Sequence, residues 1–160
     1  MSELPPPSLL DRLTDHDPSN VKESYAAGQL SPRQMKVILR RDLIWLLTTI
    51  RLEEVTNLDD WPRAKATVIN YGVRDLSGVP EQNIDGLNIQ NTIRQAIWDY
   101  EPRLDRNSVD VKLIPNSEGD TRGVAKLQIA GRWANEIYQN PIFIEAQIDF
   151  ETGGIVALDG

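Results

Sequence analysis

The spacing of the hydrophobic residues changes about two thirds of the way along this chain. As far as residue 100 they recur with a helical period, whereas from Val109 to Leu113, from Ala125 to Ile129 and from Ile142 to Phe150 they alternate with polar residues. Alternation places apolar side chains on one face of an antiparallel sheet and leaves the other face to water. The order of helices first and strands second therefore predicts an α+β fold, with an N-terminal arm and amphipathic helices packed on one face of a small antiparallel sheet.

Three helices and one further strand complete the prediction. The helices are expected over residues 31–52, 60–70 and 86–100, and residues 154–158 are expected to form a short fourth strand. Gly72 follows the second helix, where the left-handed conformation is common and glycine adopts it without strain.

The first helix has the strongest signals. Ser31 and Gln34 form a capping box, and Pro32 suits the first helical position. Its apolar residues fall on one stripe, which comprises Met35, Ile38, Leu39, Leu43, Leu46 and Ile50.

One carboxylate interrupts that stripe. Asp42 projects between Ile38, Leu39 and Leu46 on the helical wheel. Burying a lone carboxylate is costly unless donors or a cation accompany it. We therefore predict a partner for Asp42.

Residues 1–30 are predicted to be an arm. Three consecutive prolines, residues 5–7, favour an extended polyproline conformation, and Leu9, Leu10 and Leu13 then share one side of a short helical turn. Two interpretations are open: a frayed terminus, which is the usual state of chain ends, or a docking element that buries the leucines against a partner.

The composition excludes several classes of function. With 160 residues, no Cys and one His, the chain suits a single domain over residues 31–160 and has no means to build a thiolate site or a multi-histidine metal centre, so we expect no metal and no cofactor. Seventeen basic and 24 acidic residues give a net charge of −7, which disfavours nucleic acid as a partner.

The sequence shows no secretory signal, and its longest apolar cluster, Leu43–Leu47, is far shorter than the roughly 20 residues that span a bilayer. We expect a cytoplasmic protein without direct membrane insertion.

The C-terminal strands are acidic. Residues 134–160 contain no Lys or Arg. The acids either form a solvated face that protects an edge strand, or belong to a surface that accepts a partner's strand, with Glu145 and Asp149 in contact with it. The acids of this region are Glu136, Glu145, Asp149, Glu151 and Asp159.

Glu101 ends the third helix, where the helix dipole disfavours negative charge by about 0.3–1 kcal/mol at an exposed position. A cation is therefore expected nearby, and Arg103, just beyond Pro102, is the nearest candidate. Arg103 can instead reach Asp42, or these charges can simply lie at the surface.

Glu101 would also be the natural acid of a peptidoglycan-cleaving glycosidase, our alternative function. A paired Arg103 would lower its pKa, which is wrong for a general acid. On the same helix Trp98 points away from the apolar face, as expected of a satellite-cluster residue or an interface anchor.

Four short motifs, in order along the chain, resemble a known family. The segments 8–13 (SLLDRL), 40–47 (RRDLIWLL) and 68–78 (VINYG, then DLSG) resemble the opening, the R-R-D-L-x-x-L-L helix and the N-Y-G…D-L-S-G turn of TssE-type type VI secretion baseplate subunits. Glu101-Pro102-Arg103 resembles the E-P-R motif of the baseplate wedge family that contractile-tail phages share with these systems. Phage members are often described as lysozyme-like.

This resemblance implies a structural subunit rather than an enzyme. It would join wedge subunits like TssF, TssG and TssK to the first ring of a contractile sheath built from subunits like TssB and TssC. The assembly would be cytoplasmic and docked at the inner membrane, and a phage tail is the alternative setting. We expect Asp42 and Arg103 to form a structural ion pair. The residues expected to bind other proteins are Leu9, Leu10, Leu13, Trp98, Glu101, Pro102, Arg103, Glu145 and Asp149.

Overall fold

The computed structural model describes residues 8–14, 19, 31–78, 85–115, 123–135 and 140–158. The chain divides into two compact units, residues 1–39 and 40–160. Of the features predicted above, the prolines 5–7, most of the arm over residues 1–30, Glu136 and Asp159 lie outside the described residues.

Four helices and four strands form the described elements. The helices are α1 (Leu9–Leu13), α2 (Pro32–Thr48), α3 (Pro62–Lys65) and α4 (Gly86–Tyr100), with single 3-10 turns η2 (Leu52–Glu54), η3 (Val68–Asn70) and η5 (Arg106–Ser108). The strands are β1 (Asp110–Pro115), β2 (Val124–Gly131), β3 (Ile142–Asp149) and β4 (Ile155–Ala157).

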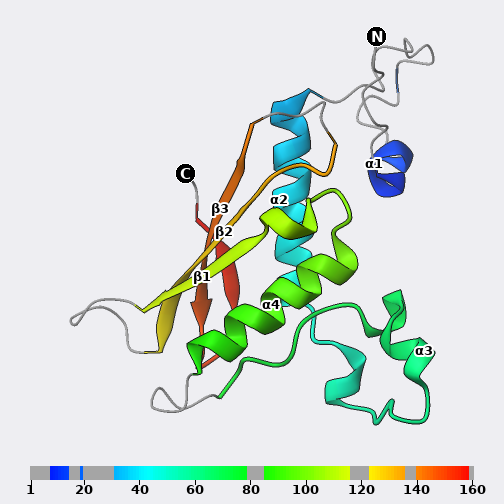
Figure 1. Ribbon diagram of the computed structural model, residues 1–160, viewed down its shortest axis with the longest axis vertical. Coiled ribbons are helices and arrows are strands. Elements are labelled where there is room, and N and C mark those ends of the chain that lie inside the picture. Colours follow the sequence, from blue (N-terminus) through cyan, green and yellow to red (C-terminus); the bar gives the residue numbers. More distant parts are fainter. Residues whose placement is uncertain are drawn as a thin grey trace. The chain divides into compact units, whose positions relative to one another are not determined.

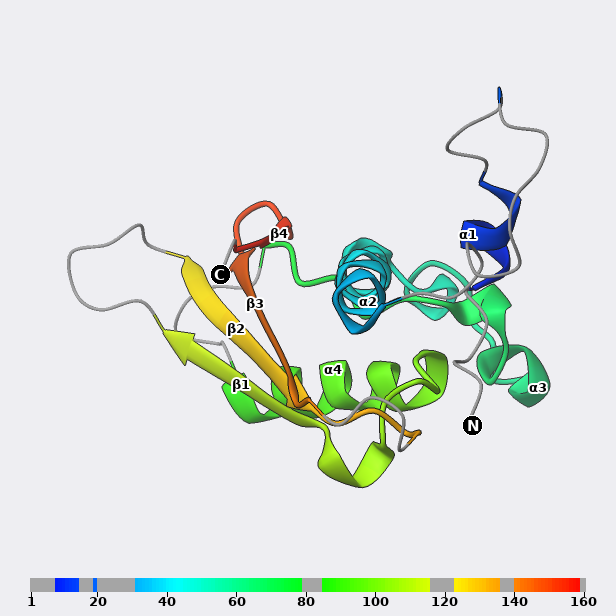
Figure 2. The ribbon, with the colours of Figure 1, turned by 90° about the horizontal axis from the view of Figure 1, so that it is seen from above.

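The strands form one antiparallel sheet in the order β1-β2-β3-β4. Burial alternates strictly along β2 and along β3, so one face of the sheet is buried and the other is wet. Helix α4 packs on β1 and lies across one face of the sheet (Figures 1 and 2). The predicted α+β class and the helix over residues 86–100 are confirmed.

The core of residues 40–160 joins the sheet to the helices. Helix α4 contributes Ile89, Ile93, Ala96 and Ile97, each at most 7% exposed. The sheet and its connections contribute Val111, Leu127, Ile129, Ile142, Ile144, Ala146, Ile148 and Phe150, and the second half of α2 contributes Leu43, Leu46 and Leu47.

Helix α2 ends four residues earlier than predicted, at Thr48 rather than residue 52. The next residues pair with a distant segment: the Val73 N–H donates to the Thr49 carbonyl (2.9 Å), and the Arg51 N–H donates to the Val73 carbonyl (3.0 Å). Ile50 lies in this parallel bridge and is 52% exposed, so its prediction as part of the buried stripe is wrong. The backbone hydrogen bonds between residues 49–51 and Val73 therefore take the place of those that would continue the helix.

The predicted helix over residues 60–70 is also wrong as a single element. It is split into α3 and η3, because Thr67 between them is extended (φ −119°, ψ 172°) and its hydroxyl accepts a hydrogen bond from the Ile69 N–H. Val68 and Ile69, in η3, are 79% and 62% exposed. Asp60 does not cap α3; Trp61 stands at that position without a side-chain bond.

Gly72 occupies a position that other residues cannot adopt without rearrangement. Its φ is +125°, and a Cβ there would lie 2.2 Å from the Thr49 carbonyl oxygen. The close approach of this turn to the end of α2 therefore requires glycine.

Two features are absent from the described residues. None of their helices is both long and apolar enough to cross a bilayer. Nor do any three of their His, Asp or Glu side chains come together in a group suited to a metal ion.

Candidate functional site

The end of α4 carries a carboxylate into the protein interior. Ile93 and Ile97 hold one side of the helix in the core, and the Glu101 N–H donates to the Ile97 carbonyl at 2.9 Å. Pro102 follows, and a residue before proline avoids the helical conformation, so the helix stops at Glu101. The Glu101 residue is only 5% exposed.

Arg103 binds this carboxylate through two nitrogen atoms of its guanidinium. Nε donates to Glu101 Oε1 at 2.6 Å, and Nη2 donates to Oε2 at 2.5 Å. The backbone here is fixed, because the Ala134 N–H donates to the Arg103 carbonyl at 2.8 Å and the Asp105 N–H donates to the Arg132 carbonyl at 2.9 Å. The segment that follows β2 thus holds Arg103 in register with Glu101.

The same guanidinium reaches the second half of α2. Arg103 Nη2 lies 2.7 Å from Asp42 Oδ2, while the other oxygen of Asp42 accepts from Arg41 Nη2 at 2.7 Å and from Arg41 Nε at 2.9 Å. Arg41 in turn stacks over the ring of Trp45, 4.9 Å from its centroid. We call Glu101, Arg103, Asp42 and Arg41 the ion network.

The ion network alternates in sign and is neutral overall. Burial by itself would lower the pKa of Arg103, but the hydrogen bonds and negative charges of Glu101 and Asp42 more than offset this and raise that pKa above its ordinary value. Burial, and then the charges of Asp42 and Glu101, raise the pKa of the nearby Tyr71 hydroxyl. Each charge of the network lies against an opposite charge, so the network holds the second half of α2 against the end of α4.

The N-Y-G motif packs beside this network, a role that sequence reasoning missed. Tyr71 and Tyr100 meet edge to face with centroids 5.2 Å apart, and the Tyr100 hydroxyl donates to the Asn70 carbonyl at 2.8 Å. The Asn70 side chain is buried and joins η2 to η3: Oδ1 accepts from the Glu53 N–H at 3.0 Å, and Nδ2 donates to the Lys65 carbonyl at 3.2 Å. The only sequence signal was the presence of a polar Asn inside an apolar run.

Trp98 and the leucines of α1 are not members of the ion network. The Trp98 indole donates to the Arg106 carbonyl at 2.9 Å, and the Arg106 guanidinium stacks over its ring. Trp98 is half-buried and forms its own small cluster with Arg106. On α1, Leu9, Leu10 and Leu13 are 69%, 47% and 75% exposed.

Glu145 and Asp149 both lie on β3, which has β2 along one side and β4 along part of the other, so the sheet edges are β1 and β4. Glu145 pairs with Lys126 (2.7 Å) and Gln128 (2.8 Å), and these bonds lower its pKa. Asp149 accepts from the Thr152 hydroxyl at 2.9 Å, which lowers its pKa. Each acid therefore has a partner within the sheet or its turn.

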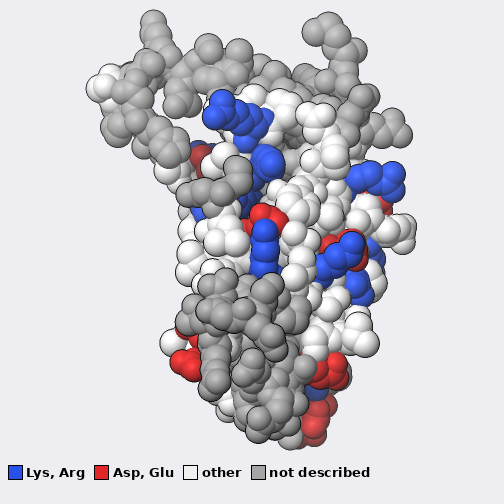
Figure 3. All heavy atoms as spheres, turned by 90° about the vertical axis from the view of Figure 1, so that its left-hand side faces the viewer, with Lys and Arg blue, Asp and Glu red and all other residues white. Residues whose placement is uncertain are grey.

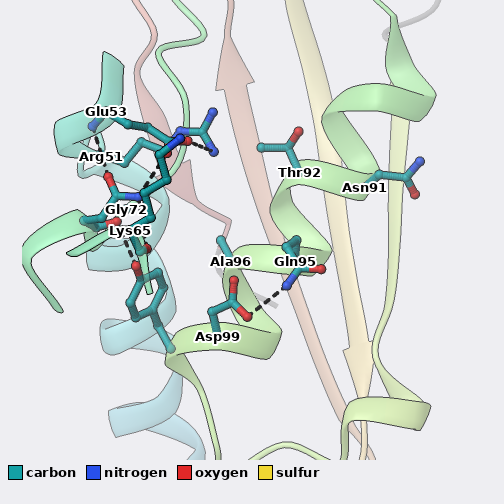
Figure 4. A pocket seen from close by; sticks show the side chains of 11 residues that line it. Arg51, Glu53, Lys65, Gly72, Asn91, Thr92, Gln95, Ala96 and Asp99 are labelled. Atoms are coloured by element: carbon teal, nitrogen blue, oxygen red, sulfur yellow. Dashed lines mark hydrogen bonds and ion pairs between the residues drawn. The ribbon is translucent and has the colours of Figure 1, made fainter. Parts of the chain in front are cut away.

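A hollow of about 450 Å³ opens between the η2–η3 segment and α4 (Figure 4). It contains two carboxylates, and both are partnered. Glu53 is paired with Arg51 at 2.8 Å, and Asp99 accepts from Gln95 Nε2 at 2.8 Å. Such paired acids are not the free general acid and base that hydrolysis requires.

The surface charge on the face shown in Figure 3 is mixed, with basic and acidic side chains interspersed among uncharged ones. A continuous basic stripe, the footprint of a nucleic-acid site, does not cross the part of this face that is described.

The glycosidase alternative fails at Glu101 itself. Both of its carboxylate oxygens accept hydrogen bonds from Arg103, and the residue is buried. It cannot reach a glycosidic oxygen of a bound saccharide.

Comparison with known proteins identifies the family to which the chain belongs. The family model described as baseplate wedge protein gp25 matches residues 33–136, which include Asp42 and the Glu101–Arg103 motif. Neither the curated proteins nor the solved structures contain a match to the chain. The chain therefore belongs to the baseplate wedge protein gp25 family, whose members are structural, non-enzymatic components of the baseplates of contractile injection systems.

Proposed function

We propose that this chain is the TssE-type subunit of a type VI secretion baseplate. In this role it joins wedge subunits of the TssF, TssG and TssK type to the first ring of a sheath of TssB- and TssC-type subunits. The assembly works in the cytoplasm, docked at the inner membrane.

The observation that carries the proposal is the convergence of the motifs. Arg41 and Asp42 of the R-R-D-L helix meet Glu101 and Arg103 of the E-P-R motif in one ion network, although about sixty residues separate them along the chain. Residues shared with TssE-type subunits therefore build one framework. This is the arrangement expected of a subunit whose shape must be maintained while neighbours bind it.

Two further surfaces support binding to neighbours. The leucines of α1 are exposed, as a docking element requires. Trp45 is 49% exposed and lies next to Arg41, and tryptophan and arginine are both enriched at interface hot spots. We propose that α1 and Trp98 contact wedge subunits. We further propose that the acidic C-terminal strands, with Glu145 and Asp149, face the sheath.

Co-expression tests this function. The chain is produced with TssF-, TssG- and TssK-type subunits, and separately with phage wedge subunits, and copurification is measured together with polymerisation of the sheath. We expect a complex with the type VI subunits. A stable complex with the phage subunits alone would place the chain in a tail baseplate instead.

The Arg103→Glu substitution connects the motif to assembly. It sets a third carboxylate beside Asp42 and Glu101, so we expect loss of the complex and of sheath polymerisation. Arg132→Glu is the control, because its side chain is 70% exposed and its partner Asp105 lies 3.3 Å away, apart from the ion network and from Trp98. Normal sheath polymerisation with Arg103→Glu would show that the motif has no part in assembly.

A further inference from the structure

A groove runs beside α4 that the ion network does not use. A second hollow, of about 360 Å³, shares Lys65, Asp99 and Tyr100 with the hollow of about 450 Å³ described above. Three residues line both hollows, so the hollows adjoin, and together they follow α4 from Asn91 to Tyr100 as the groove. We call it the α4 groove.

The two walls of the α4 groove differ in chemistry. One wall is charged and consists of Arg51, Glu53 and Lys65. The other lies on α4 and carries uncharged polar side chains beside the carboxylate of Asp99; Asn91 and Gln95 are one turn apart, and Thr92 lies between them in sequence. Figure 4 shows these residues on opposite sides of an open space.

The α4 wall offers both hydrogen-bond donors and acceptors. Gln95 uses its amide nitrogen for Asp99, and Asn91 uses its amide oxygen for Arg94 at 2.8 Å. Among the described residues, the Gln95 oxygen, the Asn91 nitrogen and the Thr92 hydroxyl take no other partner. An acceptor, a donor and a hydroxyl within about one turn of the helix suit a peptide main chain, which presents carbonyls and N–H groups in turn.

The groove fits a polypeptide better than other ligands. Small-molecule pockets are mostly apolar and enclosed, whereas this groove is open and mostly polar. Its cations, Arg51 and Lys65, are already paired with Glu53 and Asp59 at 2.8 and 2.7 Å, which leaves little excess positive charge for a phosphate backbone.

We propose that the α4 groove receives an extended segment of a neighbouring baseplate subunit and binds its main chain through Asn91, Thr92 and Gln95. The proposal rests on membership of the wedge family for the existence of a neighbour, and on the proposed type VI function for the choice of probe.

The probe is a complex of TssF-, TssG- and TssK-type subunits mixed with the full chain. A photo-crosslinking amino acid replaces Thr92, and in a matched control it replaces Leu87, which is 73% exposed on the same helix and lines neither hollow. We expect the Thr92 adduct to map to a single segment of one wedge subunit and the Leu87 position to give no such adduct.

In a second experiment, Gln95→Trp fills the groove and is expected to weaken binding to the wedge complex about tenfold or more, whereas Leu87→Trp leaves this binding unchanged. Thermal unfolding verifies that both Trp variants are folded.

The outcomes separate the groove from the function. If the wild-type chain binds the wedge complex, but Thr92 gives no localised adduct and folded Gln95→Trp binds like wild type, the groove proposal is overturned and the proposed function stands. If the wild-type chain binds none of these subunits, the proposed function and the groove's assigned partner fall together.

Discussion

Arg103 serves two carboxylates from one guanidinium. It bonds both oxygens of the buried Glu101 and one oxygen of Asp42. A lysine has no planar fork and cannot reproduce this geometry. The Arg103 side chain therefore links the end of α4 to α2 through hydrogen bonds of fixed geometry.

Replacing Arg103 by Met should destabilise the protein by about 3–5 kcal/mol, because the buried Glu101 carboxylate loses its cation and keeps only the hydrogen bond from the backbone N–H of residue 103, at 3.2 Å. Urea unfolding at pH 7 measures this loss. The double variant Glu101→Gln, Arg103→Met should recover a large part of it, since no unpaired charge then remains. Arg106→Met, at a surface pair, should stay within about 0.5 kcal/mol of wild type. Equal losses in the single and double variants would contradict the proposed role of the ion pair.

At the scale of elements, the connections decide where helices and strands end. The turn at Gly72 sets the end of α2 through the pairing of Val73 with Thr49 and Arg51. The turn after β3 is built on Asp149, which accepts hydrogen bonds from the Glu151 N–H at 2.8 Å and the Thr152 N–H at 3.3 Å. Each connection depends on one residue type at one position.

Gly72→Ala should lower the free energy of unfolding by more than about 3 kcal/mol, because it combines a positive φ with a Cβ placed against the Thr49 carbonyl. Gly78→Ala is the matched control: its φ is also positive, at +66°, but no atom lies within 4 Å of the added Cβ. It should cost only about 1 kcal/mol. Chemical denaturation measures the free energy of unfolding of both variants and so separates the effect of steric overlap from that of backbone strain alone. Similar losses of this free energy would mean that the close approach to Thr49 is unimportant.

Asp149 should make stability depend on pH. The bonds from Thr152 and Glu151 lower its pKa in the folded state, so its contribution is fully present above the unfolded pKa of about 3.9 and is lost as pH falls through the folded pKa. Asp149→Asn should therefore be less stable than wild type at pH 7 and should lose less stability between pH 5 and pH 2. Unfolding curves across this range test the prediction; parallel pH profiles would contradict it.

At the scale of the whole molecule, residues 40–160 form a compact unit with a core of their own. The exposed leucines of α1 belong to the other unit, residues 1–39. Removing α1 is thus expected to affect recognition without removing the core of residues 40–160.

Deleting residues 1–14 should leave a protein that unfolds cooperatively near the wild-type temperature but no longer joins the wedge. Differential scanning calorimetry and copurification with the wedge subunits measure the two properties separately. A chain with Leu9, Leu10 and Leu13 replaced by Ser is the matched control for length. A broad, non-cooperative transition after the deletion would show that this segment belongs to the core.

The sequence alone determined which residues face the core in the strands and in α4. Alternation along residues 125–129 and 142–150, and the helical spacing of Ile89, Ile93 and Ile97, reflect burial of one face, and this information is local. The E-P-R and R-R-D-L motifs likewise indicated the family.

Three features were decided only by the tertiary structure: the residue at which α2 ends, the break in the segment 60–70, and the sharing of the Arg103 hydrogen bonds between Glu101 and Asp42. Each depends on groups far apart in sequence: Val73 pairs beside Ile50, and Asp42 meets Arg103 across sixty-one positions. Local spacing predicts that a buried carboxylate needs a partner, but which partner it has depends on how the helices pack. The α4 groove follows the same rule, because its two walls come from segments that only folding brings together.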